Sequence, residues 1–225
     1  YQVNMSKRTI SKSYFSREDL GLPEKGFVFC CFNNNYKVTP STFASWVRIL
    51  KAVDGSVLWL FETNSFSSSQ LKKEATKYGV HEERLVFAKR LPVEEHLSRL
   101  KQADLFLDTL PYNAHTTCSD ALRVELPILT LIGKSFASRV AASLLESIDL
   151  SELIVSSISE YESLAIELAL NPKKLSNIKN KIATNILSTS LFDSQLFTKK
   201  LEEAYFKMNK TRQNNSKHQH IYIDH

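Results

Sequence analysis

Glycine is scarce in this sequence, with five among 225 residues, and the common glycine-rich and catalytic signatures are absent. No GxGxxG, GxxxxGK, GxSxG or HExxH pattern occurs. These absences argue against dinucleotide oxidoreductases, P-loop NTPases, serine hydrolases and zinc proteases. A phosphate site in this chain would therefore have to use a helix N-terminus instead of a glycine-rich cradle.

Cysteine and long hydrophobic runs are also lacking. The three cysteines show no CxxC spacing, and Cys30 and Cys31 lie inside an apolar run, which favours reduced thiols in a cytoplasmic protein over disulfides or a zinc site. No run approaches the roughly 18 apolar residues of a membrane span, and the N-terminus lacks a signal peptide's apolar core. We therefore expect no membrane association. The chain begins with Tyr1 instead of Met, which indicates part of a longer protein.

The charge balance is mildly basic. The formal net charge is +5, hydrophobic residues make up 43% and charged residues 24%, which is typical of a globular domain. The excess suits an anionic ligand, but it is too small and too scattered to indicate nucleic-acid binding.

Apolar runs alternate along the chain with segments of helical periodicity. The run Phe27–Phe32 is continuous and flanked by turn residues, which is typical of a strand covered on both faces. Further strands are predicted at 56–61, 84–87, 104–107 and 128–131, with helices beginning at Pro40 and spanning 67–78, 93–102, 117–124 and 137–146. This alternation predicts an α/β fold with a Rossmann-like, doubly wound parallel sheet.

The pattern changes near residue 150. Three helices are expected beyond it, at 159–170, 172–188 and 194–210, packed on the sheet domain or reaching a neighbour. The polar composition of the following residues predicts disorder in 211–225.

The stretch from Leu107 to Leu122, LDTLPYNAHTTCSDAL, joins a predicted strand to a predicted helix. Thr116 or Thr117 is the expected N-cap, and Asp120 follows Thr117 by three residues, as in a capping box. The first N–H groups of a helix lack internal partners and carry partial positive charge, so the junction also suits an anion. The residues alone leave both interpretations open.

Two other segments are expected at the same edge, because ligands bind at the carboxyl ends of the strands in an open α/β sheet. Asn34 and Lys37 follow the first strand, while Leu91, His96 and Arg99 follow the third. Lys37 suits a phosphate and Asn34 a ligand oxygen, but both also suit a solvated loop. His96 and Arg99 could contact a flat heterocycle or could lie on an exposed helix face.

Two residues of the central stretch have further candidate roles. His115 could serve in acid–base chemistry or could only hydrogen-bond the turn backbone. Asp120 could bind ribose hydroxyls, as acidic residues do in nucleotide-binding folds.

Five strings of the sequence carry a family resemblance: FNNNYKVTPSTFASWVRIL, SVLWL, LPVEEHLSRLKQADLFLDT, HTTCSDAL and ASRVAASLL. Together they resemble the C-terminal catalytic lobe of the O-linked N-acetylglucosamine transferases, over about Gly21 to Lys207. The resemblance implies a GT-B fold, in which two Rossmann-like lobes hold a nucleotide sugar between them. Residues 1–20 would then come from the preceding lobe, 21–150 would form the nucleotide-sugar lobe, and 151–210 would be helices packed on it.

The resemblance also implies roles for individual residues. Lys37 matches the lysine of the FNxxYK motif, which binds the diphosphate and stabilises the leaving group, and is the expected catalytic residue. His96 matches the histidine that stacks near uracil, and Asp120 matches the aspartate that holds the ribose. The remaining candidates are a phosphate-facing Asn34, Leu91 in the base pocket, Arg99 beside the base, and His115, Thr116 and Thr117 of the diphosphate-binding HTT motif.

The implied reaction is the inverting transfer of N-acetylglucosamine from UDP-GlcNAc to Ser or Thr hydroxyls of acceptor proteins, without a metal or other cofactor. The implied partners are UDP-GlcNAc or UDP, an acceptor protein, the N-terminal catalytic lobe and tetratricopeptide repeats.

Two departures from the animal members leave the donor open. Val93 replaces a lysine that reaches the nucleotide, and Cys118 replaces a glycine after HTT. One alternative is GDP-fucose as donor, as in SPINDLY-type members. Another is a non-catalytic nucleotide-binding or interaction lobe, although Lys37 and the HTT motif are both present. A nucleotide-sugar epimerase would need a carboxylate pair that we do not find.

Overall fold

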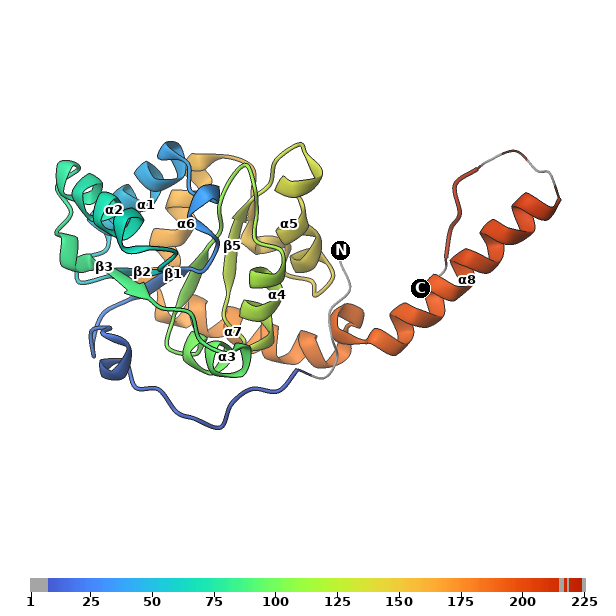
Figure 1. Cartoon of the computed structure of the whole chain (residues 1–225), viewed down its shortest axis with the longest axis horizontal. Helices are drawn as coiled ribbons and strands as arrows, with labels where there is room; N and C mark the ends of the chain where they lie inside the picture. Colours follow the sequence, from blue (N-terminus) through green and yellow to red (C-terminus); the bar gives the residue numbers. More distant parts are fainter. Residues whose placement is uncertain (1–7, 215–216, 218, 224–225) are drawn as a thin grey trace.

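Parallel strands form one sheet in the computed structural model, which describes residues 8–214, 217 and 219–223 (Figure 1). The strands are β1 (Val28–Cys31), β2 (Val57–Phe61), β3 (Leu85–Ala88), β4 (Leu105–Leu107), β5 (Ile128–Leu131) and β6 (Ile154–Val155). Their order is β3-β2-β1-β4-β5-β6, and each neighbouring pair is parallel. The predicted α/β class with a doubly wound parallel sheet is confirmed.

The strand order reverses between β1 and β4, which pair with each other through Phe29–Leu105 and Cys30–Phe106. Both strands are buried along their whole length, as their continuous apolar runs predict. The loops that follow β1 and β4 therefore lie at the switch point, where ligands bind in such sheets. β6 was not predicted, because a two-residue strand is too short to show a hydrophobic pattern.

Helices connect the strands and continue after the sheet. They are α1 (Pro40–Ala52), α2 (Ser65–Lys77), α3 (Val93–Leu100), α4 (Thr116–Arg123), α5 (Val140–Glu146), α6 (Ile158–Leu170), α7 (Pro172–Ser188) and α8 (Ser194–Gln213). α1 starts as its sequence predicts, because the Thr39 hydroxyl accepts a hydrogen bond from the Thr42 N–H and Pro40 occupies the first turn. α1 packs on α6, while α3 packs on α4, which also contacts α5 and α7.

The two ends of the described chain behave differently. Residues 8–20 run along the lobe, and the Ser11 N–H donates to the Glu94 carbonyl at the start of α3 (Figure 1). α8 instead extends away from the sheet and contains no buried residue (Figure 1). It continues to Gln213, so residues 211–213 are helical where we expected disorder. Residues 215, 216, 218, 224 and 225 of the predicted tail lie outside the described residues.

Candidate functional site

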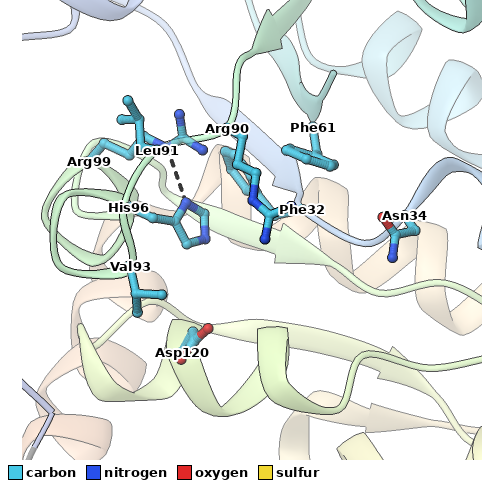
Figure 2. Close-up of a pocket in the computed structure, with 9 residues that line it drawn as sticks. All are labelled: Phe32, Asn34, Phe61, Arg90, Leu91, Val93, His96, Arg99 and Asp120. Carbon is cyan, nitrogen blue, oxygen red and sulfur yellow. Dashed lines mark hydrogen bonds between the residues drawn. The ribbon is translucent and has the colours of Figure 1, made fainter. Parts of the chain in front are cut away.

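A pocket of about 300 Å³ opens at the carboxyl ends of the strands, between α3 and α4 (Figure 2). Its lining residues are Phe32, Asn34, Phe61, Arg90, Leu91, Val93, His96, Arg99 and Asp120. The structure thus brings together five of the residues singled out in the sequence, from the loops after β1 and β3 and from α3 and α4. Asp120 on α4 lies across the pocket from His96 on α3 (Figure 2).

Arg99 is a buried part of the pocket, so the alternative of an exposed helical arginine is wrong. The residue is 3% exposed, and its Nη1 donates to the Lys89 carbonyl at 2.6 Å. Its Nε donates to His96 Nδ1 at 3.1 Å (Figure 2). The guanidinium also lies over the Phe32 ring, 5.1 Å from the centroid. Arg99 therefore fixes the loop after β3 and the orientation of the His96 ring.

His96 is held as a neutral imidazole. Burial, followed by the charges of Arg99 and Arg8, lowers its pKa to about 4. Since Nδ1 accepts from Arg99, the neutral ring carries its proton on Nε2 and can donate to a ligand. The ring lies 4.9 Å from the Phe32 ring in an edge-on arrangement. Aromatic rings beside a hydrogen-bond donor make this part of the pocket suitable for a flat heterocycle.

Lys37 lies beside the pocket, against the loop that leads into α4. It ends the single-turn 3-10 helix Asn35–Lys37, and its Nζ donates to the Asn113 carbonyl at 2.9 Å. The ammonium group also lies 3.8 Å from the centroid of the Tyr112 ring. Burial lowers the Lys37 pKa, while the charge of Asp108 raises it. The predicted cation and the predicted anion-binding loop are therefore in direct contact.

The predicted capping of α4 is wrong. The N-cap is His115, and its side chain makes no capping bond. Thr117 Oγ1 instead donates to the side-chain oxygen of Asn33 at 2.5 Å, and Asp120 pairs with Arg8. Thr116 is exposed at the first helical position. The first N–H groups of a helix lack intrahelical partners, so the start of α4, where Thr116 is exposed, can bind an anion.

Asn33 and Asp108, which the sequence reasoning missed, form a buried network beneath the site. Asp108 Oδ1 accepts from the backbone N–H groups of Thr109 and Ala114, and from the Asn33 amide at 3.2 Å. Its other oxygen accepts from the Thr130 hydroxyl at 2.7 Å. Burial raises the Asp108 pKa to about 6 against these hydrogen bonds.

The positions of Asn33 and Asp108 in the sequence could have identified them as candidate site residues. Asn33 and Asp108 are among the first polar residues after β1 and β4, which are neighbouring parallel strands. The network connects the loop before α4 to Thr117, so it sets the geometry of the predicted anion site.

His115 makes contacts typical of a structural residue. Its Nε2 lies 3.4 Å from the Ala137 carbonyl, and its ring lies 5.2 Å from Tyr112 and 6.2 Å from Phe136. Burial lowers its pKa. These contacts join the loop before α4 to the loop after β5, and they favour the turn-stabilising role over acid–base chemistry.

Other classes of site are not found among the described residues. No group of three or more His, Cys, Asp or Glu side chains in that part of the chain could hold a metal ion. Within the same residues, no helix is long and apolar enough to cross a membrane. The three cysteines are free and buried, including Cys30 and Cys31 in the predicted strand β1.

The model of one protein family, Glycosyl transferase family 41, matches residues 6–201 of the chain. The chain belongs to glycosyltransferase family 41. A similar relative is an Arabidopsis thaliana protein named a probable UDP-N-acetylglucosamine–peptide N-acetylglucosaminyltransferase SEC, which is 39% identical over 85% of this chain and 20% of its own length. A Caenorhabditis elegans UDP-N-acetylglucosamine–peptide N-acetylglucosaminyltransferase is 35% identical over 86% of this chain and 17% of its own length. This family 41 chain thus spans about a fifth of the length of these relatives.

A solved structure of similar fold is a mutant O-GlcNAc transferase from Thermobaculum terrenum. It has a TM-score of 0.77 and 33% identity, over 81% of this chain and 36% of that one. The glycosyltransferase WaaG shares only 14% identity, with a TM-score of 0.61, and so shows the fold alone. The fold of the family 41 chain is that of one lobe of a GT-B glycosyltransferase.

Proposed function

We propose that this chain is the C-terminal catalytic lobe of a protein O-GlcNAc transferase, which transfers N-acetylglucosamine from UDP-GlcNAc to Ser or Thr hydroxyls. The proposal rests on one observation: a pocket suited to a flat heterocycle lies next to a helix-opening loop that the Lys37 ammonium group contacts. The pocket with His96 and Asp120 lies between α3 and α4, and the ammonium group of Lys37 touches the loop that opens α4. A nucleoside diphosphate has the matching sequence of groups: a flat base, a ribose and two phosphates.

The nucleoside end would occupy the pocket. The base would lie against His96 and Leu91, with Arg99 holding the His96 ring, and the Nε2–H of His96 would donate to the base. The carboxylate of Asp120 would accept from ribose hydroxyls, since ionised carboxylates only accept.

The diphosphate end would lie at the start of α4. The partial positive charge of the helix and its unpaired N–H groups would attract the phosphate oxygens. Thr116 presents an exposed hydroxyl there, and Thr117 is held by Asn33 at the next position. Lys37 and Asn34 would contribute from the loop after β1.

The chemical step would need stabilisation of the charge that develops on the departing diphosphate. Lys37 and the α4 N-terminus would supply it electrostatically, which is why the proposal requires no metal ion. Attack by the acceptor hydroxyl from the opposite side of the anomeric carbon would invert its configuration.

The rest of the enzyme would supply the remaining parts. The relatives are about four to five times as long as this chain, which leaves room for an N-terminal catalytic lobe and tetratricopeptide repeats that bind acceptor proteins. We place the activity in the cytoplasm, in keeping with the free thiols of the buried cysteines.

The test is transfer activity of the full-length protein carrying Lys37→Ala. We expect turnover to fall by about 10²–10³ or more, as for the loss of other groups that stabilise a developing negative charge. Lys51→Ala is the matched control, because Lys51 also donates to a backbone carbonyl, that of Tyr78 at 3.3 Å, on an exposed part of α1. Near-normal turnover by Lys37→Ala would refute the proposal.

The donor base can be tested separately by titrating the same protein with UDP and with GDP. Tighter binding of UDP is the expected result. Tighter binding of GDP would instead favour GDP-fucose as the donor, with the nucleotide bound at the same site.

A further inference from the structure

Arg8 reaches the nucleoside end of the pocket from a segment far away in the sequence. Its guanidinium Nη1 donates to Oδ1 of Asp120, the carboxylate that lines the pocket. The side chains of Arg8 and Asp120 are 26% and 9% exposed. The pair is therefore largely shielded from water, where an ion pair is stronger than on an open surface.

The position of Arg8 is fixed by contacts further along the same segment. The Ser11 N–H donates to the Glu94 carbonyl at 3.0 Å, and the Ser98 hydroxyl donates to the Ser13 carbonyl at 2.5 Å. Ile10, which lies between Arg8 and Ser11, packs against the hydrophobic core. The segment is thus tied to both ends of α3, and Arg8 lies close enough to His96 for its charge to lower the pKa of that ring.

A buried carboxylate without a partner tends to take up a proton. Burial raises the pKa of Asp120, while the charge and hydrogen bond of Arg8, and to a lesser extent the charge of Arg123, lower it. Arg8 occupies only one of the two carboxylate oxygens, so Oδ2 remains able to accept a hydroxyl donated by a ligand.

We propose that Arg8 is a positioning residue for nucleoside recognition: it orients Asp120 so that this carboxylate can accept a ribose hydroxyl. The inference rests on the proposed function and adds to it a residue outside the motifs that the sequence singled out. It predicts that Arg8 affects recognition of the ribose hydroxyls and of no other part of the nucleotide.

Arg17 provides a matched control within the same segment. Its Nη2 donates to Asp104 Oδ2 at 2.9 Å, and both side chains are 21% exposed. This pair also joins the N-terminal segment to the sheet domain, but Asp104 does not line the pocket. A general loosening of the segment should therefore appear equally in Arg8 and Arg17 variants.

The experiment measures the affinities of the full-length protein for UDP and for 2′,3′-dideoxy-UDP by calorimetry. We expect Arg8→Gln to weaken UDP binding about 10-fold, because a misoriented Asp120 would lose its charge-assisted hydrogen bond to the ribose, and to leave dideoxy-UDP binding unchanged. Arg8→Lys should restore part of the UDP affinity, and Arg17→Gln should bind UDP normally. In an Asp120→Asn background, Arg8→Gln should have no further effect.

Three results would overturn the inference: equal losses for UDP and dideoxy-UDP, equal losses in Arg8→Gln and Arg17→Gln, or tighter UDP binding in Arg8→Gln. The last would mean that Arg8 competes with the ribose. The proposed function fails separately, if the wild-type protein binds neither nucleotide, and the inference then fails with it.

Discussion

The hydrogen bond from Arg99 to His96 determines which nitrogen of the His96 ring can donate a hydrogen bond to a ligand. Because Nδ1 accepts and burial keeps the ring neutral, His96 is a donor through Nε2 over the whole neutral pH range. The ring should therefore titrate with a midpoint near pH 4. NMR of the labelled imidazole checks this, and a midpoint near 6.5 would contradict the geometry.

Asp108 gives a second residue-scale prediction, about stability. Its pKa is about 6 in the folded protein against 3.8 for an unperturbed carboxyl, so the folded state holds the proton to higher pH. The stability that this group contributes is complete below about pH 4 and is lost as pH rises through 6. Relative to the wild type, Asp108→Asn should gain about 3 kcal/mol in free energy of unfolding between pH 4 and pH 7.

Urea denaturation across that pH range measures the effect. Asp54→Asn, at an exposed carboxylate, is the control and should give no comparable gain. An Asp108→Asn curve that runs parallel to the wild-type curve would show that Asp108 is not the buried titrating group described above.

At the scale of elements, the start of α4 gives different surroundings to Thr116 and Thr117, which are adjacent in the sequence. Thr117→Val removes the bond to Asn33 and should lower the free energy of unfolding by about 1–2 kcal/mol, as well as weakening UDP binding. Thr116→Val should weaken UDP binding but leave the free energy of unfolding within about 0.5 kcal/mol, because Thr116 is exposed. Calorimetric titration and urea denaturation give both quantities. Equal stability losses would show that Thr117 is not anchored as described.

The elements were largely predictable from the sequence because their signals are local. Continuous apolar runs gave β1 to β5 to within about one residue, and helical periodicity, with Pro40 opening the first helix, gave the helices. Parallel pairing then followed from the alternation of strands and helices. The order of β1 and β4 at the switch point placed the candidate residues at one edge.

The details of the site were not predictable because their partners are distant in sequence. The Thr117 hydroxyl looks like a helix cap, but Asn33, 84 residues earlier, accepts its hydrogen bond. Asp120 looks like the end of a capping box, but Arg8, 112 residues earlier, pairs with it. The hydrophobic periodicity of the sequence does not reveal such contacts, because they depend on how the loops after β1 and β4 and the N-terminal segment pack together.

At the scale of the whole molecule, this chain has the fold of one lobe of a GT-B glycosyltransferase. It covers 36% of the Thermobaculum terrenum transferase chain and about a fifth of the relatives from Arabidopsis thaliana and Caenorhabditis elegans. On the proposed function, nucleotide recognition belongs to this lobe, while acceptor binding and transfer require the rest of the protein. Defects caused by variants of the pocket should therefore appear in nucleotide binding as well as in turnover.

The most direct test of the central claim compares UDP with uridine in the full-length protein, with and without Lys37→Ala. If Lys37 and the N-terminus of α4 hold the diphosphate, wild-type protein should bind UDP at least about 10-fold more tightly than uridine. Lys37→Ala should remove most of that difference and leave uridine affinity unchanged. Equal affinities of the wild type for UDP and uridine, or an equal loss of both in Lys37→Ala, would contradict the account.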